Sequence, residues 1–144
     1  IFILSTNYEG RDNGCIIDTA IQSSSDPITI SLTVDKKSLT CEMLQKSEKC
    51  TISIIGKDAD IELFRHWGYQ SGRQVDKLKN YPFTKSTPND TLAITNGTNA
   101  YLSINITTQL DLGSHILFIG TPIDAQLLTD TPSMTYINYT ETLK

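Results

Sequence analysis

The sequence has 144 residues, enough for one domain that buries about two thirds of the surface its unfolded chain would expose. Its formal charge is −4, and its 12 lysines and arginines are scattered along the chain. Nucleic-acid binding requires clustered basic side chains, and a membrane span requires about 18 consecutive apolar residues. Neither pattern is present, so we expect a single domain over residues 1–144 with no nucleic-acid or membrane partner.

Alternating apolar and polar residues predict short strands along most of the chain. The alternation is clearest at 28–34 and 102–107. Weaker patterns predict further strands at 1–6, 15–18, 51–55, 92–95, 115–120, 123–128 and 134–139.

Two helices are expected between these strands. The first begins near Ser38 or Thr40, whose hydroxyls can cap free N–H groups, and runs to about Lys46. The second covers 59–67, and Gly68 is its natural stop. A βαβ fold would need helices between most strands, so the pattern predicts a mainly β fold, a closed or nearly closed antiparallel barrel with two or three short helices.

The segment 69–90 is polar, contains Pro82 and Pro88, and has no clear periodicity. It is therefore expected to be a loop. Loops of this length inside compact domains are usually functional or disordered.

Three cysteines, Cys15, Cys41 and Cys50, give an odd number and no C-x-x-C pair. This favours reduced thiols in a cytoplasmic protein over a disulfide framework, and no metal site is expected. Cys15 and Cys50 lie in predicted strands as small core residues. Cys41, in the first turn of the first helix, is the best candidate for an activated thiol.

An anion site is predicted where the strand 28–34 meets the first helix. Free N–H groups at the helix start, two lysines (Lys36 and Lys37) and the hydroxyls of Ser38 and Thr40 come together there. An ordinary capped helix with solvated lysines is the alternative for this segment taken alone.

Three other segments carry polar groups suited to a ligand. Residues 13–19 are expected to form a polar turn and a short strand, and hydrogen-bonding side chains continue to Pro27. Such a surface suits a flat heteroaromatic ligand. A plain loop is equally consistent with the sequence here. In 67–77, Trp67 is expected in the core, and Gly72 allows close approach to a ligand.

His115 stands where a glycine turn meets the apolar strand 116–119, which is expected to be buried on both faces as in a barrel wall. The alternative to a ligand-binding role for His115 is a structural histidine that is hydrogen-bonded within the protein. For Asp76 and Lys77, the alternative is a surface ion pair.

Five segments, in this order, resemble the flavin reductase-like family of FMN-binding split barrels. They are N-G-C-I-I-D-T, Q-S-S-S-D-P, D-K-K-S-L-T, G-Y-Q-S-G-R-Q-V-D-K and D-L-G-S-H-I-L-F-I-G. The resemblance runs over nearly the full length and implies an antiparallel split β-barrel that binds FMN.

The resemblance also implies roles for individual residues. Lys77 and His115 would lie near the isoalloxazine on opposite sides of the pocket mouth, as catalytic and flavin-binding residues. Tyr136 and Tyr139 would pack near the ring or a partner subunit. Relatives commonly carry Asn in place of Asp18, whose carboxylate would lower the flavin potential if it points inward. The other implied flavin-binding residues are Asn13, Cys15, Asp18, Thr19, Lys37, Ser38, Thr40, Ser71 and Gly72.

Three functions stay open on this basis. The first is an NAD(P)H-dependent oxidoreductase that passes electrons through FMN to free flavin, a ferric centre or a redox protein such as a rubredoxin. The second is a non-catalytic FMN electron carrier of the flavoredoxin type, and the third is a flavin-free barrel for another ligand. No glycine-rich dinucleotide motif is present to decide between the first two. The resemblance further implies a homodimer with FMN near the interface.

Overall fold

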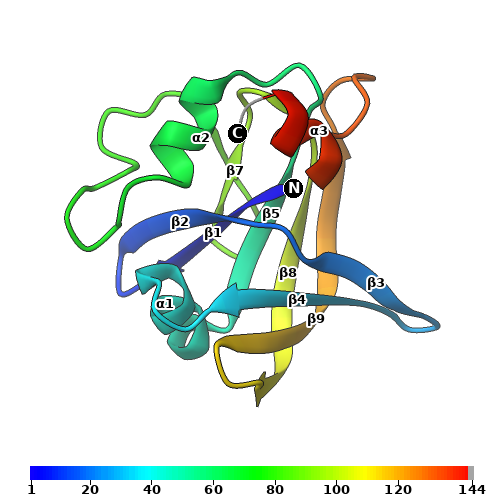
Figure 1. The fold of residues 1–144 in the computed structure, drawn as a ribbon. Coiled ribbons are helices and arrows are strands. Elements are labelled where there is room, and N and C mark those ends of the chain that lie inside the picture. The colour runs from blue at the N-terminus through cyan, green and yellow to red at the C-terminus, as the bar shows by residue number, and fades with distance from the viewer. Residues whose placement is uncertain (143–144) are drawn as a thin grey trace.

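The computed structural model describes residues 1–142, which form one strongly curved antiparallel sheet, a small two-stranded sheet and three short helices (Figure 1). The elements in chain order are β1 (Phe2–Tyr8), β2 (Arg11–Ile17), β3 (Ala20–Ser25), β4 (Ile28–Asp35), α1 (Leu39–Ser47), β5 (Lys49–Ile55), α2 (Ile61–Trp67), β6 (Thr84–Ser86), β7 (Leu92–Ile94), β8 (Thr98–Asp111), β9 (His115–Leu127) and α3 (Tyr136–Thr142).

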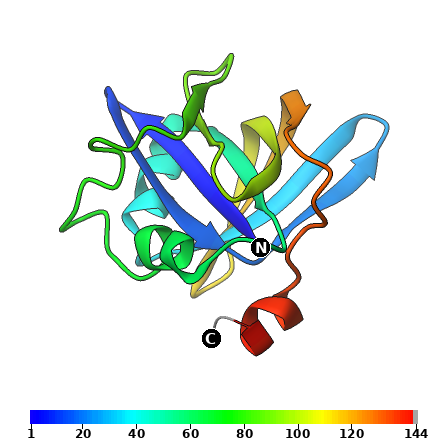
Figure 2. The ribbon, with the colours of Figure 1, turned by 90° about the horizontal axis from the view of Figure 1, so that it is seen from above.

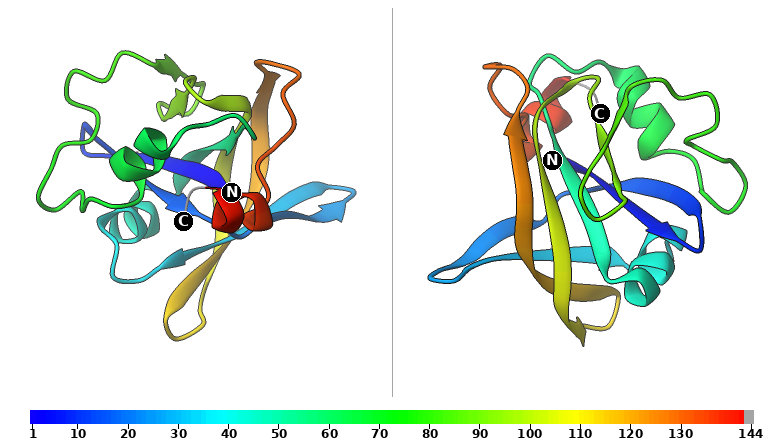
Figure 3. Two further views of the ribbon diagram at one scale, coloured as in Figure 1. Left: turned by 45° about the horizontal axis from the view of Figure 1, so that its top comes forward. Right: turned by 180° about the vertical axis from the view of Figure 1, so that it is seen from behind.

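The large sheet has the strand order β2-β1-β5-β8-β9-β4-β3, with every neighbouring pair antiparallel. Seen from behind, its central strands follow one another around the molecule (Figure 3). Strands β2 and β3 lie at opposite edges of this order, although only residues 18–19 separate them in the chain. The sheet therefore curls until its two edges are joined by this short link, and the Thr33 N–H donates to the Thr19 carbonyl at 3.2 Å, next to the last β3–β4 pair.

Within residues 1–142 no ladder joins β2 to β4, so the barrel is open along one line. This confirms the expected antiparallel split barrel. The helices α1 and α2 also lie where the sequence predicts them, with Ser38 as the N-cap of α1 and Asp60 as that of α2.

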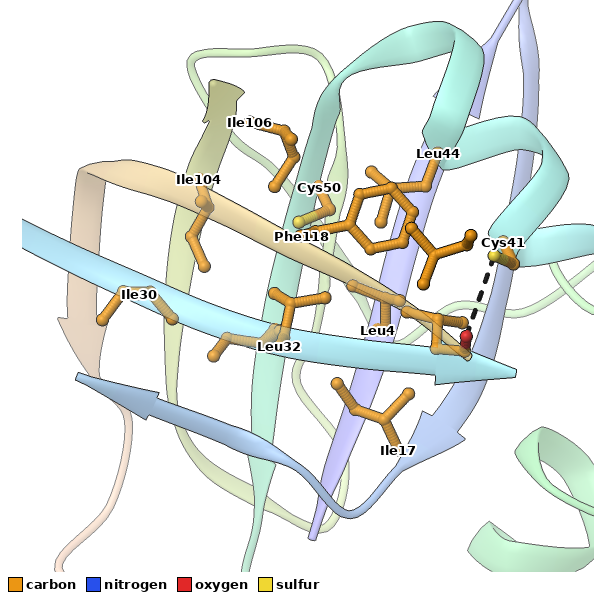
Figure 4. Packing of buried hydrophobic residues seen from close by; sticks show 13 residues of the cluster. Leu4, Ile17, Ile30, Leu32, Cys41, Leu44, Cys50, Ile104, Ile106 and Phe118 are labelled. Atoms are coloured by element: carbon orange, nitrogen blue, oxygen red, sulfur yellow. Dashed lines mark hydrogen bonds between the residues drawn. The ribbon is translucent and has the colours of Figure 1, made fainter. Parts of the chain in front are cut away.

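The barrel interior is filled by aliphatic side chains around Phe118, and α1 closes one end of it (Figure 4). A second buried cluster, which includes Phe64 and Trp67, packs α2 against the other side of β1. In β9, Ile116 is buried but Leu117 is only half-buried. This strand therefore has one buried face, and the expectation of full burial on both faces is wrong.

The strand expected at 134–139 is also wrong, because Tyr136–Thr142 form the helix α3. Tyr and Ile favour strands, yet a local capping pattern decides the outcome. The Asn138 N–H donates to Thr135 Oγ1 at 3.1 Å, and the Thr135 N–H donates back to Asn138 Oδ1 at 3.3 Å. This reciprocal arrangement is a capping box with Asn in place of Glu or Gln.

The polar turn expected at 13–14 is instead the middle of β2. The chain reverses earlier, at residues 9–10, so that Tyr8 pairs with Arg11. Gly14 serves close packing rather than a turn, since a Cβ there would lie 3.0 Å from the Trp67 ring and 2.8 Å from the Leu4 carbonyl.

Two further differences concern β3 and β9. The polar run 20–25 forms the edge strand β3, where no strand was predicted. The strands expected at 115–120 and 123–128 are one strand, β9. Pro122 is accommodated there because it lies at an irregularity in the β8–β9 register, where a ladder hydrogen bond is not required.

Buried hydroxyl groups fix the long loop, which is irregular apart from β6 and short turns, onto the outside of β5 and β8. Thr51 Oγ1 lies 2.7 Å from Thr91 Oγ1 and 3.1 Å from Ser103 Oγ. Asn89 Oδ1 accepts hydrogen bonds from Thr87, Thr91 and Ser103 at 2.7–3.0 Å. The loop is therefore held by a hydrogen-bond network centred on one amide.

Replacing Asn89 by Ala should lower the free energy of unfolding by about 2–3 kcal/mol, because buried hydroxyls lose their common acceptor. The Ile104 carbonyl also loses the Asn89 amide donor at 3.1 Å. Urea denaturation measures the change. The control is Asn96→Ala at an exposed position, where we expect a change within about 0.5 kcal/mol. Equal effects of the two substitutions would contradict the role given to Asn89.

Candidate functional site

A cleft of about 420 Å³ lies along the split of the barrel. Its walls come from β2, the end of β4, the start of α1 and the segment 67–77. Segments far apart in the sequence thus converge on one hollow. The predicted site residues that line it are Asn13, Cys15, Lys37, Ser38, Thr40, Ser71, Gly72 and Lys77.

One wall of this cleft is held by a buried contact between Asn13 and Thr40. The Asn13 amide donates to Thr40 Oγ1 at 3.0 Å, and both residues are buried. Gly72 packs directly on Asn13, since a Cβ at position 72 would lie 2.4 Å from Asn13 Oδ1. Arg11 adds a further tie by donating to the Gly72 carbonyl. The segment 67–77 is therefore fixed to β2.

Lys77 lies in the wall of the cleft and is almost fully buried. Its ammonium donates to the Gly14 carbonyl at 2.8 Å and to the Trp67 carbonyl at 2.9 Å. Burial lowers the pKa of Lys77, and the neighbouring Cys15 thiol partly offsets this effect. Two of its three N–H groups thus bind protein carbonyls. Lys77 therefore contributes positive charge to the cleft mainly as part of its wall.

The start of α1 forms the cationic end of the cleft. Ser38 Oγ accepts from the Cys41 N–H at 3.1 Å, as an N-cap, and donates to the Asp35 carbonyl at 2.9 Å. Lys37 is exposed at the mouth. Arg73, which the sequence analysis did not single out, reaches the Lys37 carbonyl at 3.5 Å. The sequence could have indicated Arg73, because it directly follows Gly72, which was expected to lie close to a ligand.

A second cleft, of about 250 Å³, continues along the split. It shares Ile16, Ile17 and Asp35 with the first cleft, so the two hollows are neighbours. Asp18 and His115 line this second cleft rather than the first. The predicted site residues are therefore divided between two connected hollows.

His115 is exposed, and its Nδ1 lies 2.8 Å from Ser114 Oγ. It faces Asp35 across the β4–β9 pair. The helix α3 contributes Tyr136 and Tyr139 to the same cleft. Tyr139 is fixed there by stacking on Phe64, with ring centroids 4.8 Å apart.

Thr19 lines neither cleft. Its side chain is exposed, and its hydroxyl donates to Asp18 Oδ1 at 3.0 Å. Its predicted contact with the flavin stays a prediction.

The cysteines are free thiols. Cys41 is fully buried and its thiol donates to the Val34 carbonyl at 3.8 Å (Figure 4). Burial raises the pKa of Cys41 to about 11 and that of Cys50 to about 12. Cys41 was the best of the three candidates for an activated thiol, but low exposure and a raised pKa both oppose thiolate chemistry there.

Residues 1–143 match the family model described as the flavin reductase like domain. The chain belongs to this family. The flavin reductase-like chain is 32% identical over 139 residues to the high molecular weight rubredoxin of Moorella thermoacetica, covering 96% of this chain and 60% of that protein. It therefore spans about three fifths of that relative.

This flavin reductase-like chain is also similar to another curated protein and to solved structures. The ferric-chelate reductase (NAD(P)H) of Archaeoglobus fulgidus is 24% identical over 96% of this chain and 82% of that protein. A crystal structure of the FMN-binding protein from Thermus thermophilus superposes with a TM-score of 0.80 at 24% identity, covering 91% and 74% of the two chains. Flavoredoxin from Methanosarcina acetivorans gives 0.78 at 18% identity, covering 88% and 67%.

Two features are absent from residues 1–142. No helix in this range has the length and apolar character needed to cross a membrane. No three acidic, histidine or cysteine side chains there are arranged to hold a metal ion.

Replacing Gly72 by Ala should destabilise the cleft wall, because the new methyl group overlaps the buried Asn13 amide. We expect a loss of about 1–3 kcal/mol in the free energy of unfolding, measured by urea denaturation. The loss should shrink when Asn13→Ala provides the missing space. If the cost of Gly72→Ala is the same in both backgrounds, the two residues do not pack as described.

Proposed function

We propose that this chain binds FMN along the split and passes electrons from NAD(P)H through it to an acceptor, as a flavin-dependent oxidoreductase. One observation carries the proposal: a hollow with a cationic end adjoins a second hollow that contains aromatic side chains, along the open edge of the barrel. FMN has the matching shape, with an anionic phosphate at one end and a flat ring at the other. Family membership and the FMN-binding neighbour support this choice.

The groups present fit this ligand. At the cationic end are the Lys37 ammonium, the Arg73 guanidinium and the N–H groups at the start of α1, which suit a phosphate. Where the two clefts adjoin, Ile16 and Ile17 offer apolar surface for a ring. The cleft-facing edges of β2 and β4 also leave backbone groups for the ring's polar edge.

Bound FMN would supply the hydride-accepting and one-electron chemistry. The chain's own residues would bind it, orient it and set the charge around it. Lys77 would place positive charge behind the first cleft, where negative charge on a reduced ligand is stabilised. His115 would donate a hydrogen bond or a proton from the rim of the second cleft.

A non-catalytic electron carrier is the second candidate, and one relative favours it. The high molecular weight rubredoxin is the relative with 32% identity, and this chain accounts for about three fifths of its length. Electron delivery to a rubredoxin-like redox protein therefore remains a proposal beside ferric or flavin reduction.

The first test is to titrate the purified chain with FMN and then add NADH or NADPH without oxygen. We expect the visible flavin band to shift on binding and then to bleach with at least one nucleotide. Loss of the His115 imidazole in His115→Ala should lower the potential of bound FMN, because a donor to the reduced form is removed. Binding without bleaching favours the carrier, and no binding leaves only a flavin-free barrel.

We also propose a homodimer with FMN near the interface. The hairpin β3–β4 extends beyond the barrel (Figure 2) and exposes Ile21 and Ile28. On β9, Ile123 and Leu127 are exposed as well, Leu127 to 83%. Several exposed apolar side chains on neighbouring strands are typical of a surface that a partner covers.

Leu127→Asp should weaken this dimer at least about tenfold, because an unpaired carboxylate would be buried in the interface. Sedimentation velocity over a range of protein concentrations measures the shift towards monomer. Leu112→Asp, in the turn between β8 and β9, is the control, since Leu112 is also exposed (53%). A wild-type chain that is monomeric at high concentration would contradict the dimer.

We propose a cytoplasmic location. All three cysteines are free thiols, two of them fully buried. Reduced thiols persist in the cytoplasm, whereas secreted domains of this size commonly carry disulfides.

A further inference from the structure

An ion pair stands beside the cationic end of the first cleft without lining it: Glu42 lines a neighbouring hollow and also pairs with Lys46 at 3.7 Å. Arg73 Nη2 lies 3.0 Å from Glu42 Oε2 and 3.5 Å from the Lys37 carbonyl oxygen. Both side chains of the pair are about half exposed, Arg73 to 48% and Glu42 to 46%. Arg73 is thus held beside Lys37, which itself lines the cleft.

Glu42 lies in the first turn of α1, where the helix dipole attracts negative charge. The Arg73 guanidinium lowers the pKa of Glu42, so the carboxylate is charged at neutral pH. The free protein therefore already holds one anion near the place proposed for the flavin phosphate.

The hydroxyls nearest this place have other partners. Ser38 Oγ bonds to the Cys41 N–H and the Asp35 carbonyl, and Thr40 Oγ1 accepts from Asn13. The charged groups therefore have the greater part in binding an incoming anion.

We propose that Glu42 is a built-in competitor for the phosphate of FMN. In the free protein it holds Nη2 of the Arg73 guanidinium, and it opposes phosphate binding there by competition and by repulsion of like charge. This inference rests on the function proposed above. Competition by Glu42 would keep bound FMN exchangeable. Arg73 would distinguish FMN from riboflavin, which lacks the phosphate.

The physical basis is the unequal strength of the two pairings. A half-exposed Arg–carboxylate pair contributes little, because solvent screens it and long side chains lose freedom. A phosphate dianion carries more charge and accepts two parallel N–H groups from a guanidinium. Exchange is therefore favourable, but Glu42 reduces the gain by competition and by repulsion of like charge.

Titration of the full chain with FMN and with riboflavin, followed by flavin fluorescence, tests the proposal. Glu42→Gln should tighten FMN about three- to tenfold and leave riboflavin unchanged. Arg73→Gln should weaken FMN about tenfold, again without an effect on riboflavin. In the Arg73→Gln background, Glu42→Gln should increase the FMN affinity much less, because the guanidinium for which Glu42 competes is no longer present.

A matched control comes from α2, where Glu62 and Arg65 form an exposed ion pair away from both clefts. Glu62→Gln should change neither affinity. Weaker FMN binding by Glu42→Gln would overturn the proposal, since Glu42 would then orient Arg73 rather than compete for it. Equal changes for riboflavin, or a full gain without Arg73, would also overturn it. If the wild-type chain binds riboflavin but not FMN, the proposal of competition by Glu42 is overturned and the flavin function stands. If it binds neither, both proposals are overturned.

Discussion

The absence of a ladder between β2 and β4 is the constraint on which the site depends. A barrel that closes pairs every strand edge, and its wall offers a ligand only side chains. Here the edges at 13–17 and 33–35 are not joined to each other in the described sheet. Their backbone N–H and C=O groups need partners, and an open edge beside a hollow supplies both hydrogen bonds and space.

An open edge must also be kept from collapsing or pairing with another chain. The segment 67–77 performs this task from one side: Lys77 ties it to the Gly14 carbonyl, Arg11 binds the Gly72 carbonyl, and Gly72 fits over Asn13. Lys77 thus acts chiefly as a clamp between β2 and the end of α2. Its charge also contributes to the first cleft, which it lines.

Local signals made part of this arrangement predictable from the sequence. The strict alternation at 28–34 and the Ser38 cap followed from rules of period and capping, and both hold. The failures arose where tertiary packing or capping overrode a common local preference. Asn13-Gly14 usually marks a turn, but the Trp67 ring requires a glycine in mid-strand. At 135–138 a capping box outweighed β-favouring side chains.

The site itself was less predictable, because convergence is a property of the folded sheet. Motif resemblance named residues that line the hollows, yet it did not separate the first cleft from the second, and it passed over Arg73. The contact of Arg73 with Glu42 joins positions 31 residues apart. No periodicity or short motif reports such a pairing.

The two clefts differ in charge, and this difference bears on the direction of electron flow. Lys37 and Arg73 stand at one end, Asp35 lines both clefts, and Asp18 lines the second cleft beside His115. Reduction adds negative charge to a flavin ring, and nearby carboxylates make that charge less favourable. A ring lying between Asp18 and Asp35 would therefore have a lowered potential and give up its electrons more readily. Such a site suits the donation of electrons to a ferric centre or a redox protein better than their storage.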